Sequence, residues 1–146
     1  MSGLSASTPL TPITIAPAPV GDGYVPGVCN IGPWEIRKRR TIGIVGFVTA
    51  AIAFAALVAL HAPALSRLVL FLPLMGGTFS WLQARRHFCA GFAFARITNF
   101  GDADSTRRSV EDEAAHRADM AAVARMIRDA FLISLPITIV AVLLPL

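Results

Sequence analysis

Three long apolar blocks constrain the fold of this chain more than any other feature. Residues 42–60 run for nineteen positions without a charge, residues 68–82 for fifteen, and residues 130–146 for seventeen. A helix of about twenty residues spans the ~30 Å hydrocarbon core of a bilayer. In water, a helix that is apolar on every side needs a partner on every side, and a 146-residue chain is too short to supply them. The blocks therefore predict an all-α fold, a three-helix transmembrane protein with spans at about 42–61, 64–84 and 128–146.

The basic residues predict how these spans are oriented. Of the thirteen Lys and Arg residues, four lie at 37–40 and eight between 85 and 128, which leaves only Arg67 in the turn between the first two spans. The positive-inside rule places the flanks that carry twelve of these charges in the cytoplasm. We therefore expect a multi-pass protein of the bacterial cytoplasmic (inner) membrane. Its N-terminus and its connection at 85–127 face the cytoplasm, and its C-terminus lies outside.

This charge distribution also bears on the partners of the chain. A sequence pI near 10 is typical of nucleic-acid-binding proteins. Here, however, the basic residues flank apolar spans and do not form a stripe on a folded surface, so we expect no nucleic-acid partner. The lipid bilayer is the first expected partner, with attraction to anionic headgroups as a secondary effect of the same charges.

Residues 1–28 differ in composition from the rest of the chain. They hold five of the ten prolines and show no helical or strand period, which predicts a disordered, Pro-rich cytoplasmic tail. They also lack the basic and apolar regions of a cleavable signal peptide. The predicted membrane domain is then 29–146. In it, one helix starts at Pro33 and reaches about Leu60, and Arg67 extends to the membrane interface.

Small residues predict how the first two helices meet. Pro73 and Gly76–Gly77 fall within the second apolar block, and Gly43 and Gly46 fall within the first. In lipid, small residues let two helix backbones approach closely. The alternative is a kink that opens a ligand pocket. The spans carry no charge near their centres, which favours close packing and argues against an ion or proton path.

The cytoplasmic connection is predicted to contain an interfacial segment and an amphipathic helix. Phenylalanines are mixed with arginines over residues 85–100, as in segments that lie at a membrane surface. The helix is expected to begin near Ser109, with Asp112 in its capping box, and to continue into the third span. One of its faces carries an interaction stripe: His116, Met120, Val123 and Ile127. Two interpretations stay open, namely packing of this stripe on the chain's own helices and docking of a partner subunit.

The two cysteines form a second candidate site. An antiparallel pair of helices brings Cys29 and Cys89 to the cytoplasmic face, with His87 two residues from Cys89. Cys and His side chains in this number suit zinc or copper, and nearby arginines would lower the pKa of a thiol. Cys29, His87 and Cys89 are therefore candidate metal ligands. The alternatives are thiols that only pack at the base of the hairpin and a redox-active or acylated cysteine.

No catalytic motif appears in the sequence, so we expect a non-enzymatic protein. The favoured function is an accessory or scaffold subunit of a membrane complex, which would bind a membrane protein partner or form a homo-oligomer. The alternative is a cytoplasmic-face metal-binding or thiol redox protein. A weaker third hypothesis is an enzyme acting on lipid headgroups, for which no catalytic set is visible.

Two segments carry a resemblance to a known group. "GVCNIGPWEIRKRR" and "FLPLMGGTFSWLQARRHFCAGFAFARITNFG" resemble a CNIGP…HFC pattern of small, uncharacterised bacterial three-span integral membrane proteins. The resemblance covers roughly residues 24–101. It implies the same three-span topology, draws attention to Cys29, Asn30, His87, Cys89 and Asn99, and implies no activity.

Overall fold

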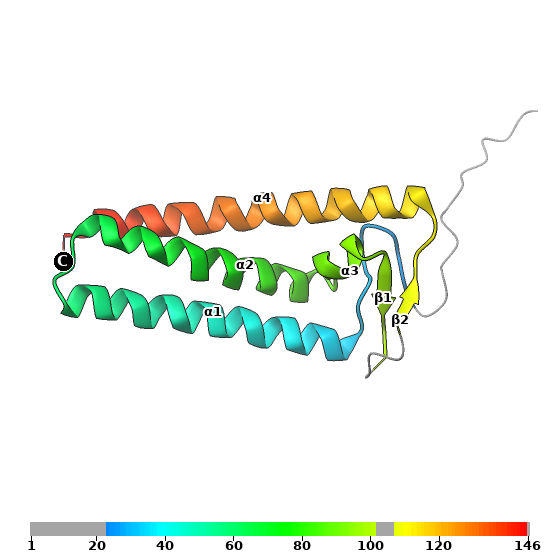
Figure 1. Ribbon diagram of the computed structural model, residues 1–146, viewed down its shortest axis with the longest axis horizontal. Helices are drawn as coiled ribbons and strands as arrows, with labels where there is room; N and C mark the ends of the chain where they lie inside the picture. Colours follow the sequence, from blue (N-terminus) through cyan, green and yellow to red (C-terminus); the bar gives the residue numbers. More distant parts are fainter. Residues whose placement is uncertain (1–22, 102–106, 146) are drawn as a thin grey trace, which may run out of the picture.

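The computed structural model describes residues 23–101 and 107–145 and is predominantly helical. Three long helical segments run side by side, and a small domain closes one end of them (Figure 1). The elements in chain order are α1 (Pro33–Ala59), the 3-10 helix η1 (Ala64–Leu70), α2 (Phe71–Arg85), α3 (Ala90–Phe94), β1 (Ile97–Asn99), β2 (Arg107–Ser109) and α4 (Glu113–Leu143). α1, η1 with α2, and α4 are each long and apolar enough to cross a membrane. The predicted all-α, three-helix fold is confirmed.

The predicted close packing of the first two spans occurs through three glycines. A Cβ atom added to Gly46 would lie 2.7 Å from the Cα atom of Gly77, and one added to Gly43 would lie 3.1 Å from the Gly77 carbonyl oxygen. Only glycine leaves room for two helix backbones at this separation. Gly76 has no atom within 4 Å of its would-be Cβ, so it faces away from α1 and takes no part in the contact.

The third span packs on α2, which lies between α1 and α4 (Figure 1). The Ser134 hydroxyl of α4 donates a hydrogen bond to the Thr78 hydroxyl of α2 at 3.2 Å, and both residues are buried. Polar bonds of this kind hold apolar helices together within lipid. Pro136 lies inside α4, which continues past it without a break to Leu143.

Arg67 has a different role from the predicted one. Its side chain is 2% exposed, and Nη1 donates hydrogen bonds to the carbonyl oxygens of Ala141 at 3.1 Å and Leu144 at 2.7 Å. The last carbonyls of a helix have no intrahelical partner, and a cation there also interacts favourably with the helix dipole. Arg67 therefore caps the C-terminus of α4 from η1, and the expectation that it reaches outward to the membrane interface is wrong.

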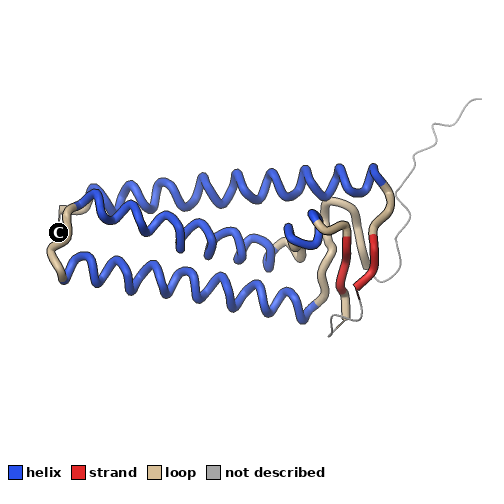
Figure 2. The backbone as a smooth tube through the Cα atoms, viewed as in Figure 1, coloured by secondary structure: helices blue, strands red, loops and turns tan. Residues whose placement is uncertain are grey.

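The end of the bundle opposite η1 is closed by a small domain, which we call the cap (residues 23–32, 86–101 and 107–112). In it, β1 and β2 pair antiparallel with Thr98 opposite Arg108, and Ile31 bridges to Asn99 in parallel. The strands and their neighbouring loops all lie at this one end (Figure 2). Gly32 is needed there, because a Cβ atom on it would lie 2.5 Å from the Phe100 carbonyl oxygen.

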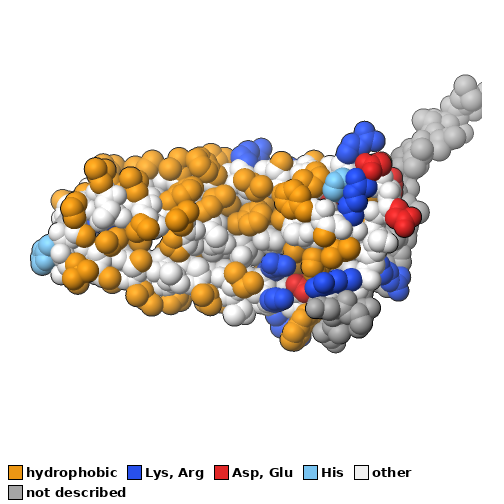
Figure 3. All heavy atoms as spheres, viewed as in Figure 1, with side chains coloured by type: hydrophobic (Ala, Val, Ile, Leu, Met, Phe, Trp, Pro, Cys, Tyr) orange, Lys and Arg blue, Asp and Glu red, His pale blue; other side chains and the backbone are white. Residues whose placement is uncertain are grey.

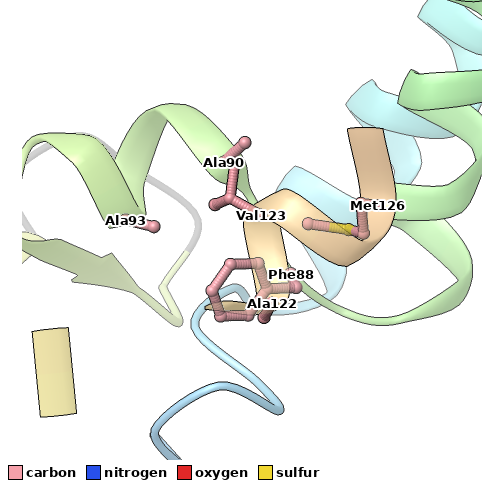
Figure 4. Packing of buried hydrophobic residues seen from close by; sticks show 6 residues of the cluster. All are labelled: Phe88, Ala90, Ala93, Ala122, Val123 and Met126. Atoms are coloured by element: carbon pink, nitrogen blue, oxygen red, sulfur yellow. The ribbon is translucent and has the colours of Figure 1, made fainter. Parts of the chain in front are cut away.

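The cap and α4 share an apolar cluster that packs one against the other. Side chains from the segment around α3 meet side chains from α4 in one buried cluster (Figure 4): Phe88, Ala90, Ala93, Ala122, Val123 and Met126. Phe88 and Phe92 are 1% and 8% exposed, although the sequence placed them at a membrane surface. Phe88 and Phe92 therefore pack inward within a folded domain, which corrects the prediction for these two residues, whereas Phe94 is 59% exposed.

Two predicted boundaries also change. Residues 1–22 of the expected disordered tail lie outside the described residues, whereas 23–28 are folded and Tyr24 is fully buried. The predicted start of the last helix near Ser109 is wrong as well, because Ser109 ends β2. Asp112 caps α4 instead, with its side chain accepting a hydrogen bond from the Ala114 N–H at 2.9 Å.

Candidate functional site

The cap contains the five residues to which the resemblance drew attention. Cys29, Asn30, His87, Cys89 and Asn99 all lie in it, brought together from segments up to seventy residues apart. The charged side chains gather at the same end, and hydrophobic side chains cover the remainder of the face in view (Figure 3). The candidate functional site is therefore the cap together with the ends of α1, α2 and α4 that enter it.

Asn30 joins the first and second segments of the cap. Its Nδ2 atom donates to the Cys89 carbonyl at 3.0 Å, and its Oδ1 atom accepts from the Cys89 N–H at 2.7 Å. Its own backbone N–H donates to the His87 carbonyl, and its carbonyl accepts from the Asn99 N–H. Asn30 and Cys89 are both fully buried. The Asn30 side chain thus supplies the hydrogen bonds to the buried Cys89 N–H and carbonyl groups that a neighbouring strand would otherwise supply.

A second polar contact fastens the N-terminal segment to α4. Asp119 is 2% exposed, and its two carboxylate oxygens accept hydrogen bonds from the Tyr24 hydroxyl at 2.9 Å and the Gly27 N–H at 2.6 Å. Burial, and then the hydrogen bond to Asp119, raise the pKa of Tyr24 well above its ordinary value. The phenol therefore stays protonated at neutral pH.

The cysteines do not have the environment that the sequence suggested. Burial raises the pKa of Cys29, with a smaller opposite effect from its bond to the Ile31 carbonyl, so the expected lowering by nearby arginines is wrong for this thiol. The Cys89 sulfur is fully buried and accepts a hydrogen bond from Arg39 Nη2 at 3.0 Å. Both cysteines are free thiols.

The predicted metal ligands do not form a coordinating group. Over residues 23–101 and 107–145, no three His, Cys, Asp or Glu side chains are arranged so that they could hold a metal ion. Cys29, His87 and Cys89 share the cap, but the sulfur atoms bond to Ile31 and Arg39 instead, and the His87 side chain is exposed. A zinc or copper site on these three residues has no support in this geometry.

The predicted interaction stripe on the last helix is divided between the inside and the outside of the molecule. Val123 is 1% exposed and belongs to the buried cluster of the cap, while Ile127 is 44% exposed. His116 and Met120 are half-buried. Packing within the chain therefore explains Val123, and the expectation that Val123 contacts a partner is wrong. For His116, Met120 and Ile127, docking of a partner stays a prediction.

Basic and aromatic side chains surround the junction of the cap with the spans. Arg37 lies over the Trp34 ring at 5.8 Å from its centroid, and Arg40 lies over the Trp81 ring at 5.5 Å. Cation–π pairs of this kind hold guanidinium groups at an aromatic surface. Hollows of about 560, 340 and 430 Å³ open beside Trp34, beside Trp81 and beside Arg125 respectively. The junction thus presents concave basic surfaces next to the apolar spans.

Sequence reasoning missed several of the residues that build the site. Tyr24, Asp119 and Gln83 were not singled out, although each makes a buried polar contact. The Gln83 side chain, for example, accepts from the Ala90 N–H at 2.9 Å. Glu35, in the first turn of α1, is also 2% exposed and lies 3.7 Å from Arg39. Gln83 and Asp119 each lie beside apolar residues in the sequence, which could have indicated a buried polar contact. The same pattern is also typical of a solvent-exposed helix face.

Searches of protein-family models, curated proteins and solved structures found no match to this chain. The resemblance to small bacterial three-span membrane proteins therefore stays a prediction.

Proposed function

We propose that the protein is a non-enzymatic integral membrane protein that serves as an accessory or scaffold subunit of a membrane complex. The observation that carries the proposal is an apolar groove of about 320 Å³ between α1 and α4, in the part of the bundle that is apolar enough to lie in lipid. Apolar side chains line it on all three helical segments: Phe47, Ala50, Ala51, Phe54, Leu70, Leu74, Ile137, Val140, Ala141 and Leu144.

The shape of this groove suits a helix from another chain. α1 and α4 both pack on α2, and they leave the groove open between them. Ala50, Ala51 and Ala141 are the small residues that permit a close helix–helix approach in lipid. The apolar stretch of α1 is only 11% buried by its own chain. A helix of a partner protein, or α1 of a second copy of this chain, would cover part of the exposed apolar surface of α1.

The use of the polar residues also supports a structural role. Asn30, Gln83 and Asp119 are each at most 4% exposed, and each bonds a backbone group of another segment. Side chains engaged in this way fix the ends of the spans relative to one another. A rigid three-helix unit is what a scaffold subunit needs.

The proposal includes the orientation predicted from the sequence, with the cap in the cytoplasm of a bacterial cell. Its support is the charge distribution: twelve of thirteen basic residues belong to the end of the molecule that carries the cap, and Arg67 alone belongs to the other end. The alternative function, in metal or thiol chemistry, is less well supported, because Cys89 is buried and the three predicted ligands do not converge.

Photo-cross-linking in membranes tests the groove with a matched pair of leucines. Leu74 lines the groove, whereas Leu72, in the same helix, is 71% exposed and outside it. A diazirine amino acid at position 74 is expected to give a discrete protein adduct, either with a partner or with a second copy of this chain. The same probe at position 72 is expected to label lipid. Lipid adducts alone from both positions would contradict the proposal.

A further inference from the structure

A hollow at the junction of the cap and the spans has the features of a binding site for an anionic group. It has a volume of about 340 Å³ and is lined by Ile36, Arg40, Trp81, Ala84, Arg85 and His87. Arg40 lies two residues before the apolar run that starts at Ile42, and Arg85 is the last residue of α2. The hollow therefore sits at the level where both spans change from apolar to charged sequence.

Its positive charge is not neutralised within the described part of the chain. No carboxylate lines the hollow, and neither Arg40 nor Arg85 forms an ion pair with any described residue. The hollow beside Arg125 is different. There, the Asp129 carboxylate forms ion pairs with Arg86, at 2.6 Å, and with Arg128, at 2.9 Å. Of these two hollows, the one beside Trp81 keeps its guanidinium charge available for a ligand.

The lining combines this charge with an apolar surface. The Arg40 guanidinium stacks over the Trp81 ring, which holds a flexible side chain at the hollow. Ile36 and Ala84 add aliphatic surface beside it. Free phosphate in water gains nothing from such a surface, whereas a phosphate that carries acyl chains does.

The turn that ends α2 places His87 among the residues that line this hollow. His87 has φ of 52°, a left-handed conformation that glycine adopts most easily at a helix end. The helix-ending bond from the Phe88 N–H to the Gln83 carbonyl and the bond from the Asn30 N–H to the His87 carbonyl hold it there. The imidazole remains exposed. The imidazole is therefore positioned to donate a hydrogen bond to a ligand in the hollow.

We propose that this hollow binds the phosphate group of an anionic phospholipid. Arg40 and Arg85 contact the phosphate oxygens, His87 donates a further hydrogen bond, and Trp81 with Ile36 packs against the first carbons of the lipid. The site is independent of the groove between α1 and α4, so it does not rest on the chain being a subunit of a complex.

Lipid binding to the full chain in neutral detergent tests the proposal. Phosphatidylglycerol, phosphatidylcholine and inorganic phosphate are titrated separately, with the bound species counted by native mass spectrometry. The double variant Arg40→Gln/Arg85→Gln is expected to lose about 25-fold in phosphatidylglycerol affinity, about fivefold for each basic residue at a membrane surface. The control, Arg37→Gln/Lys38→Gln, removes the same charge from the hollow beside Trp34 and is expected to retain most of the affinity.

Three results would overturn the proposal. An equal loss in both double variants would show diffuse attraction to the whole basic surface. Equal binding of phosphatidylcholine would remove the requirement for net anionic charge. Binding of inorganic phosphate as tight as that of the lipid would identify a free phosphate ligand.

A second variant separates the ligand role of His87 from a structural role. Glycine fits the left-handed backbone at least as well, so His87→Gly is expected to keep thermal stability while lowering phosphatidylglycerol affinity severalfold. His61 has the same backbone conformation, with φ of 50°, at the opposite end of the bundle. His61→Gly is therefore expected to leave the affinity unchanged. Full affinity in His87→Gly would exclude the imidazole from the site.

Discussion

Replacement of Asn30 by alanine should open the cap without disturbing the spans. The variant removes both bonds to Cys89, at 3.0 and 2.7 Å, in a place where neither residue is exposed. The Cys89 carbonyl keeps a bond from the Ala93 N–H at 3.1 Å, but the Cys89 N–H loses its acceptor. An unsatisfied buried donor costs about 1–3 kcal/mol and a lost hydrogen bond about 1 kcal/mol more, so we expect a loss of about 2–4 kcal/mol.

Hydrogen exchange of the cap amides measures this loss directly. Exchange through local opening reports the free energy of that opening, and a loss of about 2–4 kcal/mol corresponds to roughly 30- to 800-fold faster exchange. The amides to follow are those of Cys29 and Asn30, which donate to Val25 and His87. Val28→Ala is the control, because Val28 is 61% exposed in the same loop. Equal exchange in the two variants would refute the view that Asn30 holds the cap closed.

Three further predictions follow from glycine contacts and from buried titratable groups. Gly46→Ala should destabilise the bundle by about 1–3 kcal/mol in thermal or denaturant unfolding, because its Cβ would meet the α2 backbone at 2.7 Å. Gly76→Ala should leave the stability unchanged, because its Cβ would lie in open space. An equal loss of stability in both variants would contradict the close packing of α1 on α2. Tyr24 is the only tyrosine, so absorbance at 295 nm should show it ionising well above pH 10 when folded and near pH 10 when denatured. Because folding raises the pKa of Tyr24, the protonated phenol contributes to the free energy of unfolding by a constant amount below pH 10, and this contribution is lost above pH 10. A transition of the folded protein near pH 10 would contradict the buried Tyr24–Asp119 pair. Maleimide should modify Cys29 more slowly than a free thiol, because burial raises its pKa, and should leave Cys89 unmodified until denaturation. Rapid reaction of Cys89 would show that it is accessible.

The sequence predicted the spans well because length and apolarity alone determine them. A charge-free run of nineteen residues permits few folds other than a membrane helix. The contact between the first two spans was also predictable, because small residues in lipid have few uses other than close packing. In each case the signal lies within a single segment of the chain.

The cap could not be predicted because its structure depends on contacts between distant residues. Asn30 bonds Cys89 across 59 positions, and Tyr24 bonds Asp119 across 95. Neither pair leaves a local period or a spacing motif. Each strand of the sheet has only three residues, too few for an alternating pattern to stand out. The resemblance drew attention to Asn30, but nothing in the residues alone indicated its partner.

Arg67 and Val123 show a related limit. A lone arginine in a short turn is typical of a side chain that reaches the membrane interface, yet here it caps a helix 74 positions away. The helical spacing of the stripe that contains Val123 predicts an apolar face, but it is the same whether that face packs inward or binds a partner. Only the position of the segment around α3 decides between the two, and that position was not available from the sequence.

Cysteine labelling in intact bacterial cells tests most directly the central claim of a three-span protein with its cap in the cytoplasm. Leu60→Cys lies at the end of α1 that is far from the cap, where Leu60 is 77% exposed, and Glu111→Cys lies at an exposed position in the cap. The unsubstituted chain gives the background from the native thiols. A membrane-impermeant maleimide should label Leu60→Cys in intact cells and Glu111→Cys only after lysis. Labelling of Glu111→Cys in intact cells would contradict the orientation, and equal labelling of both positions would contradict the membrane topology itself.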